Sequence, residues 1–476
     1  MAGAPTTEVK LAVTQSLCPR CKRLVDAEVI RRNDRIIMVK RCPKHGVFEA
    51  LTCSDADWYQ WSRRFQRAGR APVHRATESD LGCPYDCGFC PEHEQHACVT
   101  LFEITQACNL ECPACFAASP HGSHSSLEEI NAMLDAVNLA EGGPADVVML
   151  SGGEPTIHPQ FEDIVGRISA SGRVKHLMVN SNGIRFAREP RLCDLLAEND
   201  VKVYLQFDGL QSGSIEMLRG SDLVKTKLTA LDQLGKAGVT VVLVATIAKG
   251  VNDNEIGAIV DLGLEHSAVR AVSFQPQFGE GRWVPFDPMD RTTVTDVIAA
   301  IAQQTGGRFA PTDFVPIPCC DPMCTAATYA WVQDGVVTPL PRLVDVEHYL
   351  DYIQNSASPA VNQILEEDFA EMRATLETLY SKSNPAGSDG QAHAFTCACE
   401  PLLELGSADL SKQLFTITIE AFMDRHNFDI SRARKCCIQE ALPDGRIVPF
   451  CVYNSLYRFA PGKRARPPVD VAAGTA

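Results

Sequence analysis

Six apolar, β-branched segments recur between residues 99 and 276, and stretches with helical spacing separate them. In order they read VTLFEIT, ADVVML, VKHLMVN, VKVYLQF, VTVVLVAT and VRAVSFQ. Strands that alternate with helices in units of about thirty residues indicate a parallel sheet with right-handed crossovers. The first intervening stretch, SLEEINAMLDAVNLA, begins with a capping box of Ser126 and Glu129. The sequence therefore predicts an α/β fold, a partial (β/α)6 barrel over residues 99–310.

Polar motifs follow four of these strands directly. A cysteine-rich loop follows the first strand, SGGEP (151–155) the second, NSNG (180–183) the third and QFDG (206–209) the fourth. In such folds the chemistry gathers at the carboxyl ends of the strands. We therefore expect the functional site at that end of the barrel.

The chain has 20 cysteines, and its opening residues MAGAPTTEVK lack the apolar core of a secretion signal. No apolar run is long enough to span a membrane, so we expect a cytoplasmic protein. In a reducing compartment, cysteines at this density indicate metal sites rather than disulfides.

The first module, residues 1–62, carries CPRC and CPKHG on either side of a strand-like segment. Two short knuckles of this kind are typical of a mononuclear tetrahedral site, as in a zinc ribbon or rubredoxin. Cys18, Cys21 and Cys42 are the predicted ligands. The fourth is His45, whose spacing mirrors the first knuckle, or else Cys53, and the metal is iron or zinc.

A second group of cysteines lies within residues 78–98, in GCPYDCGFCPEHEQHAC. Four thiols within sixteen residues suit a closed iron–sulfur cluster, with a zinc site as the alternative. The predicted ligands are Cys83, Cys87, Cys90 and Cys98.

The loop after the first barrel strand, CNLECPAC, carries only Cys108, Cys112 and Cys115. A [4Fe–4S] cluster held by three cysteines leaves one iron open. That iron can chelate the amino and carboxylate groups of S-adenosylmethionine. An electron passed into the sulfonium then yields methionine and a 5′-deoxyadenosyl radical, which is cofactor chemistry that the protein orients and shields. Taken alone, the spacing also suits a zinc loop.

Together with SGGEP at the next strand end, this loop resembles the radical S-adenosylmethionine superfamily. The resemblance implies that Gly152, Gly153, Glu154 and Pro155 hold the methionine amino group. It also implies that Asn180, Ser181 and Asn182, at the end of the third strand, contact the ribose and the carboxylate of the cofactor. Gln206 and Asp208, at the end of the fourth strand, would make further contacts with the cofactor. The segment ATIAKGVND (245–253) is similar to the stretch that packs on adenine. Ala114 departs from the aromatic residue common before the third cysteine, and Phe116 can substitute for it.

Over roughly residues 15–460 the cysteine groups also resemble the archaeal tetraether lipid synthase family and its bacterial relatives. This resemblance implies three [4Fe–4S] clusters, one for radical chemistry and two auxiliary, beside the mononuclear metal. The second auxiliary cluster would lie in the region 311–460, before a disordered tail at 461–476. Its ligands would be Cys319, Cys324, Cys436 or Cys437, and Cys451, with Cys320 as the alternative to Cys319. No function is assigned to Cys397 and Cys399. Cys193 is expected to be buried and to pack as a small hydrophobic residue.

The leading functional hypothesis is an enzyme that abstracts hydrogen from an unactivated C–H bond and joins the carbon to another, coupling lipid hydrocarbon chains. The alternative is a radical methyltransferase acting on a lipid, a pterin or another small molecule. A minor alternative is a non-catalytic iron–sulfur scaffold for electron transfer.

The expected partners follow from charge and chemistry. Radical chemistry calls for a low-potential electron donor of the flavodoxin or ferredoxin type. The net charge of −15 argues against nucleic acid. The basic segment GKRARPP near the end allows peripheral contact with a membrane.

Overall fold

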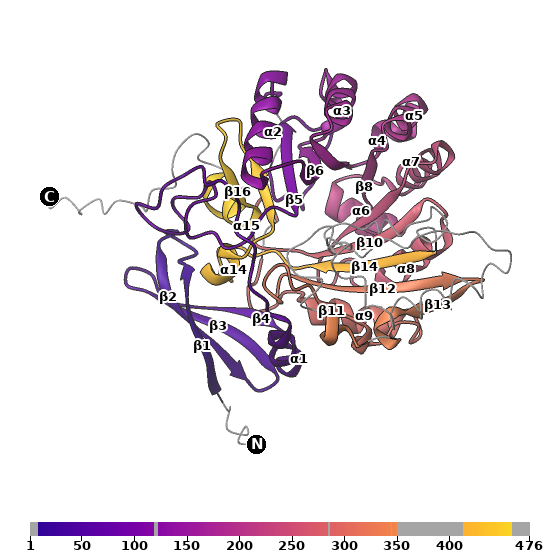
Figure 1. The fold of residues 1–476 in the computed structure, drawn as a ribbon. Helices are drawn as coiled ribbons and strands as arrows, with labels where there is room; N and C mark the ends of the chain where they lie inside the picture. Colours follow the sequence, from indigo (N-terminus) through magenta and orange to yellow (C-terminus); the bar gives the residue numbers. More distant parts are fainter. Residues whose placement is uncertain (1–7, 119–121, 284–285, 344, 350–412, 459–476) are drawn as a thin grey trace.

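The computed structural model describes residues 8–118, 122–283, 286–343, 345–349 and 413–458 (Figure 1). The tail expected to be disordered (461–476) lies outside the described residues, and so do Cys397 and Cys399.

The centre of the fold is a parallel sheet built from the six predicted strands. Each strand pairs in parallel with the next along the chain; they are β5 (Val99–Thr105), β6 (Ala145–Gly152), β7 (Val174–Ser181), β8 (Lys202–Gln206), β9 (Val241–Ile247) and β10 (Val269–Pro276). Most of their residues are buried, because helices cover one face and later segments cover the other. The predicted α/β fold with a partial barrel is confirmed.

Helices connect these strands and lie around the outside of the curved sheet (Figure 1). The longer ones are α2 (Leu127–Glu141), α3 (Phe161–Ala170), α5 (Pro190–Glu198), α6 (Ser212–Arg219), α7 (Val224–Ala237), α8 (Ile256–Glu265) and α9 (Val294–Gln304). The predicted capping box opens α2, since the Ser126 amide donates to Glu129 Oε2 at 2.7 Å and the Glu129 amide donates to Ser126 Oγ at 3.2 Å.

C-terminal strands extend this sheet at both edges, which the sequence analysis did not foresee. At one edge, β14 (Leu414–Glu420) pairs in parallel with β10, and antiparallel β12 (Thr325–Gln333) follows it. At the other edge, β15 (Ile438–Ala441) pairs in parallel with β5. With the short strands β11 (Val315–Pro316), β13 (Val336–Pro339) and β16 (Ile447–Pro449), the sheet has twelve strands in the described part of the chain.

The N-terminal module is a separate antiparallel sheet in the order β1 (Glu8–Leu17), β2 (Leu24–Arg32), β3 (Arg35–Cys42) and β4 (Gly46–Cys53), followed by α1 (Ala56–Ser62). It packs on the C-terminal region, where Thr14 Oγ1 donates to Asp429 at 2.8 Å and Lys22 Nζ donates to the Ser455 carbonyl at 2.6 Å.

Short helical turns complete the described chain: η1 (Arg63–Phe65), η2 (Pro155–Ile157), α4 (Ile184–Arg188), η3 (Pro311–Asp313), η4 (Leu340–Arg342), η5 (Val346–Tyr349), α14 (Ile430–Arg434), α15 (Phe450–Val452) and η6 (Tyr453–Tyr457). Among the described residues, none of the helices has the length and apolarity needed to cross a bilayer.

Candidate active site and metal centres

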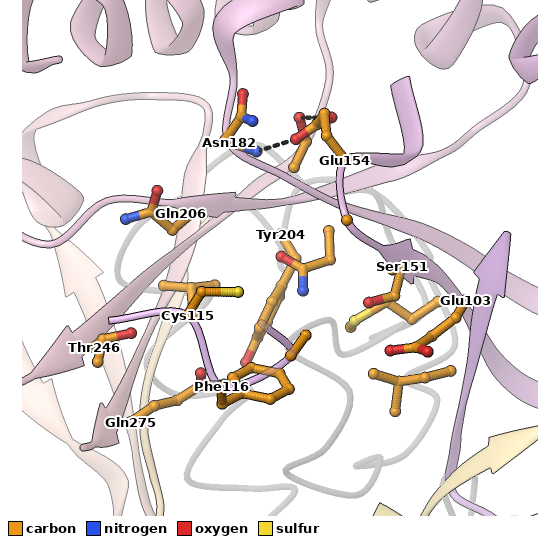
Figure 2. Close-up of a pocket in the computed structure, with 18 of the residues that line it drawn as sticks. Glu103, Cys115, Phe116, Ser151, Glu154, Asn182, Tyr204, Gln206, Thr246 and Gln275 are labelled. Atoms are coloured by element: carbon orange, nitrogen blue, oxygen red, sulfur yellow. Dashed lines mark hydrogen bonds between the residues drawn. The ribbon is translucent and has the colours of Figure 1, made fainter. Parts of the chain in front are cut away.

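A cavity of about 180 Å³ opens at the carboxyl ends of the barrel strands (Figure 2). Every strand from β5 to β10 contributes to its wall, and so do the C-terminal strands β14 and β15. The residues that the sequence placed here and that line it are Cys108, Cys112, Cys115, Gly152, Gly153, Glu154, Asn180, Ser181, Asn182 and Gln206. The structure thus brings together nearly all of the predicted cofactor-binding residues.

The three cysteines of the loop after β5 lie half-buried on the cavity wall. The loop is pinned by the Ala114 amide, which donates to the Leu218 carbonyl at 3.1 Å, and by the Arg282 amide, which donates to the Cys115 carbonyl at 3.1 Å. Burial raises the pKa of the Cys108 thiol to about 12. Three soft thiols on one loop that faces a cavity fit the [4Fe–4S] cluster predicted from the spacing.

The two glycines of SGGEP are required by a close approach of backbone to backbone. A Cβ on Gly152, whose φ is +122°, would lie 2.0 Å from the Thr105 carbonyl oxygen, and one on Gly153 would lie 2.0 Å from that of Ala107. The Gly153 and Glu154 amides donate to these same two carbonyls at 2.8 and 2.9 Å. The resemblance implies that these glycines hold the methionine amino group, and the structure shows that they also approach the chain that leads into the cysteine loop.

Glu154 ties the ends of two neighbouring strands together. Its side chain is 1% exposed and accepts hydrogen bonds from Ser181 Oγ and from the Asn182 amide, both at 2.8 Å. Thr156 Oγ1 donates to it at 2.6 Å, and Pro155 begins the short turn η2. Figure 2 shows Glu154 and Asn182 together at the rim of the cavity. The carboxylate is therefore held in one position, with further acceptor capacity toward the cavity.

The two predicted residues after β8 have different surroundings. Gln206 lines the cavity, and its Oε1 accepts from Lys227 Nζ at 2.6 Å. Asp208 is fully buried and forms an ion pair with Arg219, whose Nη2 lies 2.6 Å from Asp208 Oδ1. Arg219 lines the cavity, and its charge opposes the rise that burial causes in the pKa of Cys112. Asp208 thus acts on the site through Arg219, and its predicted contact with a cofactor stays a prediction.

The acidic part of the wall was not predicted from the sequence. Glu420, at the end of β14, accepts from Tyr204 Oη at 3.1 Å and from Gln275 Nε2 at 2.9 Å. Glu103 on β5 forms an ion pair with Arg458 at 2.7 Å. The sequence signal for these acidic residues was one glutamate in each of the short, mostly apolar strands β5, β14 and β15.

Glu440 on β15 is the third acidic residue of the wall. It is 1% exposed, and its Oε2 has no hydrogen-bond partner in the described part of the protein. Burial, reinforced by the charge of Glu103, raises the pKa of Glu440 well above its ordinary value.

Aromatic rings form another side of the cavity. The Phe422 and Phe450 ring centroids lie 4.5 Å apart, and Phe116 meets Phe450 edge-on at 5.6 Å. Phe116 was expected to replace the aromatic residue absent at position 114, and it lies on the cavity wall as that substitution requires.

The N-terminal knuckles bring four potential ligands together. The ligand atoms of Cys18, Cys21, Cys42 and His45 all lie within 4.8 Å of one another. His45 Nδ1 is 3.5 Å from Cys18 Sγ and 3.5 Å from Cys42 Sγ. Cys53 lies elsewhere, with its thiol directed at the Asp55 carbonyl at 3.2 Å. The geometry agrees with His45, rather than Cys53, as the fourth ligand.

We expect the Cys42→Ser variant to lose about one metal ion per chain with no loss of inorganic sulfide, because a mononuclear site contains none. Metal analysis and sulfide determination on the full-length protein check this. Cys53→Ser is the matched control and should keep the ion. Loss of sulfide together with metal in Cys42→Ser would contradict a mononuclear site.

The remaining cysteines group differently from the sequence-based assignment. Cys83, Cys87 and Cys90 line a small pocket beside Arg434. Cys98, which the spacing had joined to them, lies instead with Cys319 and Cys437.

The choice within the pairs Cys319/Cys320 and Cys436/Cys437 stays open, because Cys319, Cys320 and Cys437 are buried in one cluster with Cys98, and Cys324 packs against it. Burial and then the charges of Cys451 and Cys324 raise the pKa of Cys436 well above its ordinary value. The sulfur atoms of Cys98, Cys319 and Cys437 lie within 4.8 Å of one another. Cys193 is buried on α5 as predicted.

Comparisons with known proteins identify two regions of the chain. Residues 102–263 match the Radical SAM superfamily, and residues 11–54 match the HMPTM N-terminal zinc ribbon domain. The chain is 31% identical to a 7,8-dihydro-6-hydroxymethylpterin dimethyltransferase from Methanocaldococcus jannaschii, over 94% of this chain and 94% of that protein.

More distant matches cover the barrel. A GTP 3′,8-cyclase from Alkaliphilus oremlandii is 30% identical over 38% of this chain and 59% of its own length. The crystal structure of Streptococcus suis SuiB bound to S-adenosylmethionine is 15% identical over 44% of this chain and 47% of that one, with a TM-score of 0.37.

The expected superfamily is confirmed, whereas the full-length relative is a pterin methyltransferase and not a tetraether lipid synthase. The full-length similarity agrees with the incomplete cysteine triad and with the SGGEP strand end. The chain therefore belongs to the radical S-adenosylmethionine superfamily, in the family of the hydroxymethylpterin dimethyltransferase.

Proposed function

We propose that this radical S-adenosylmethionine enzyme methylates a carbon atom of a reduced pterin. The observation that carries the proposal is the 31% identity to a hydroxymethylpterin dimethyltransferase over 94% of both chains. It favours the methyltransferase alternative of the sequence analysis over the coupling of lipid chains, which the reported relatives do not support.

The wall of the cavity supports a flat, polar substrate. Phe116, Phe422 and Phe450 offer ring surfaces on which a heterocycle can stack. Glu103, Glu420 and Glu440 offer carboxyl groups to the N–H donors along the edge of a pterin. A hydrocarbon chain would leave Glu440 Oε2, which has no hydrogen-bond partner in the described part of the protein, unsatisfied, and this is costly.

When bound to the Cys108 loop, a [4Fe–4S] cluster and S-adenosylmethionine supply the radical that attacks an unactivated C–H bond. The chain orients and encloses the reactants. Glu154, fixed by Ser181 and the Asn182 amide, is placed to accept from the methionine ammonium. Arg219, fixed by Asp208, supplies positive charge beside Cys112 and stabilises its thiolate.

The net change replaces a hydrogen atom on carbon with a methyl group. The hydrogen atom leaves on 5′-deoxyadenosine, and the methyl group comes from a second sulfonium, which is released as a thioether. Two electrons, one for each sulfonium, come from an external low-potential donor, for which the flavodoxin or ferredoxin type remains the prediction.

The test is to incubate the reduced enzyme with 7,8-dihydro-6-hydroxymethylpterin and S-adenosylmethionine that carries a labelled methyl group. We expect a pterin heavier by one or two labelled methyl groups, measured by mass spectrometry. Phospholipid incubated in parallel should remain unchanged. Coupled lipid chains and an unmodified pterin would overturn the proposal.

Glu440→Gln should raise the KM for the pterin by about tenfold or more. Leaving a buried pterin N–H without an acceptor costs roughly 1–3 kcal/mol, and the amide replaces half of the carboxyl acceptor capacity with a donor. Glu128→Gln, at an exposed position on α2, is the matched control. An unchanged KM in Glu440→Gln would exclude this carboxyl group from pterin recognition.

A further inference from the structure

Lys227 is a buried cation directly behind the wall of the cavity. It belongs to α7, and the residue is 1% exposed. Burying a charge is costly unless the fold supplies partners for it, so the contacts of this side chain indicate why it is there.

The ammonium of Lys227 holds the ends of two neighbouring strands. Nζ donates to the Asn182 carbonyl at 2.9 Å, directly after β7, and to the Gln206 carbonyl at 2.7 Å, at the end of β8. A third hydrogen bond, of 2.6 Å, runs to Gln206 Oε1. Three acceptors around one nitrogen require three N–H groups, so the side chain is held in its charged form. Burial lowers the pKa of Lys227 to about 8 and the charge of Asp208 opposes that fall, which agrees with a cation at neutral pH.

Lys227 also fixes the direction in which the Gln206 amide faces. Because Oε1 accepts from Lys227, the amide nitrogen lies on the other side, where it donates to Asp208 Oδ2. An amide nitrogen carries two hydrogen atoms, so the second N–H can reach a molecule in the cavity that Gln206 lines. Without Lys227 the amide could turn and present its oxygen there instead.

At the other strand end, Asn182 connects Lys227 to the rest of the site. The Asn182 amide donates to Glu154 Oε2 at 2.8 Å, and its Nδ2 donates to Asn109 Oδ1 at 2.7 Å. Asn109 lies between the first two cysteines of the loop after β5. The carbonyl that Lys227 holds therefore belongs to the residue that joins the SGGEP carboxylate to the cysteine loop (Figure 2).

We propose that Lys227 is a positioning residue for S-adenosylmethionine. From behind the cavity wall it holds Gln206 with an N–H donor toward an oxygen atom of the cofactor, and it holds Asn182 where the Asn182 amide meets Glu154. Binding then requires little ordering of the wall, which favours affinity. The inference concerns the cofactor that the superfamily shares, so it does not depend on the identity of the methylated substrate.

The first test is Lys227→Met, which removes the ammonium and keeps the length of the side chain. In the reconstituted full-length protein we expect the binding of S-adenosylmethionine to weaken by about tenfold or more, with cluster iron unchanged because no cysteine is altered. Calorimetric titration of the oxidised protein measures the affinity without turnover. Lys225→Met, at an exposed position of α7, is the matched control and should bind as the wild type does. Wild-type affinity in Lys227→Met would overturn the proposal.

Turnover separates positioning from a general loss of structure. In Lys227→Met the KM for S-adenosylmethionine, measured by the formation of 5′-deoxyadenosine, should rise more strongly than kcat falls, because the lost interaction acts on binding. A lower kcat with an unchanged KM would overturn the proposal.

The route through the amide is tested by Gln206→Met. This residue lies on the cavity wall, so the variant keeps the proposal testable even where Lys227→Met folds poorly. It should weaken the binding of S-adenosylmethionine by about tenfold, and the double variant should lose no more affinity than Lys227→Met alone. Wild-type affinity in Gln206→Met, or losses that multiply in the double variant, would overturn the proposal.

Discussion

Replacing Cys108, Cys112 and Cys115 together by alanine should abolish the formation of 5′-deoxyadenosine and leave the protein folded. The three thiols lie on a half-buried loop at the rim of the barrel, whereas the core is formed by the strands and helices behind it. The cluster that reduces S-adenosylmethionine cannot assemble without its thiolates. Product formation measured by liquid chromatography and folding measured by circular dichroism check the two parts of this expectation.

The same triple variant should keep about two-thirds of the cluster iron, because two of the three predicted [4Fe–4S] clusters lie elsewhere. Cys193→Ala is the matched control and should retain cleavage. Cleavage at a near wild-type rate in the triple variant would contradict the radical site. Complete loss of iron would show that the auxiliary sites depend on this loop.

Glu154→Ala should weaken the binding of S-adenosylmethionine by tenfold or more, with cluster iron unchanged. A charge-assisted contact to the methionine ammonium is worth roughly 1.5–3 kcal/mol. The structure adds a second reason, because the same carboxylate holds Ser181 and the Asn182 amide at the next strand end. Titration of the reconstituted protein with S-adenosylmethionine measures the affinity.

Thr156→Val separates these two contributions. It removes the Thr156 hydroxyl that donates to Glu154 at 2.6 Å, and so disturbs the turn without removing the carboxylate. We expect a change in affinity several-fold smaller than that of Glu154→Ala. Equal losses in both variants would show that SGGEP serves only as a turn, and unchanged affinity in Glu154→Ala would exclude the ammonium contact.

Local sequence patterns determined the barrel and one end of its site. Each of the six strands is recognisable from its own apolar, β-branched residues, and parallel pairing places all their carboxyl ends at one edge. Cys108, Cys112 and Cys115 share one loop, and Glu154 follows the next strand, so no distant contact is needed to bring them together. The N-terminal knuckles were predictable for the same reason, because the hairpin between Cys21 and Cys42 fixes their separation.

Only the tertiary structure decided what the C-terminal third contributes. Glu420 and Glu440 reach the cavity because β14 pairs with β10 and β15 pairs with β5, at opposite edges of the sheet. A short apolar strand carries no local signal for its partner, since any exposed edge offers the same backbone donors and acceptors. Cys98 was grouped with Cys83, Cys87 and Cys90 because they are near in sequence. Its thiol lies with Cys319 and Cys437 because sheet pairing brings those distant segments to the start of β5, and the position of a ligand in space follows from that pairing.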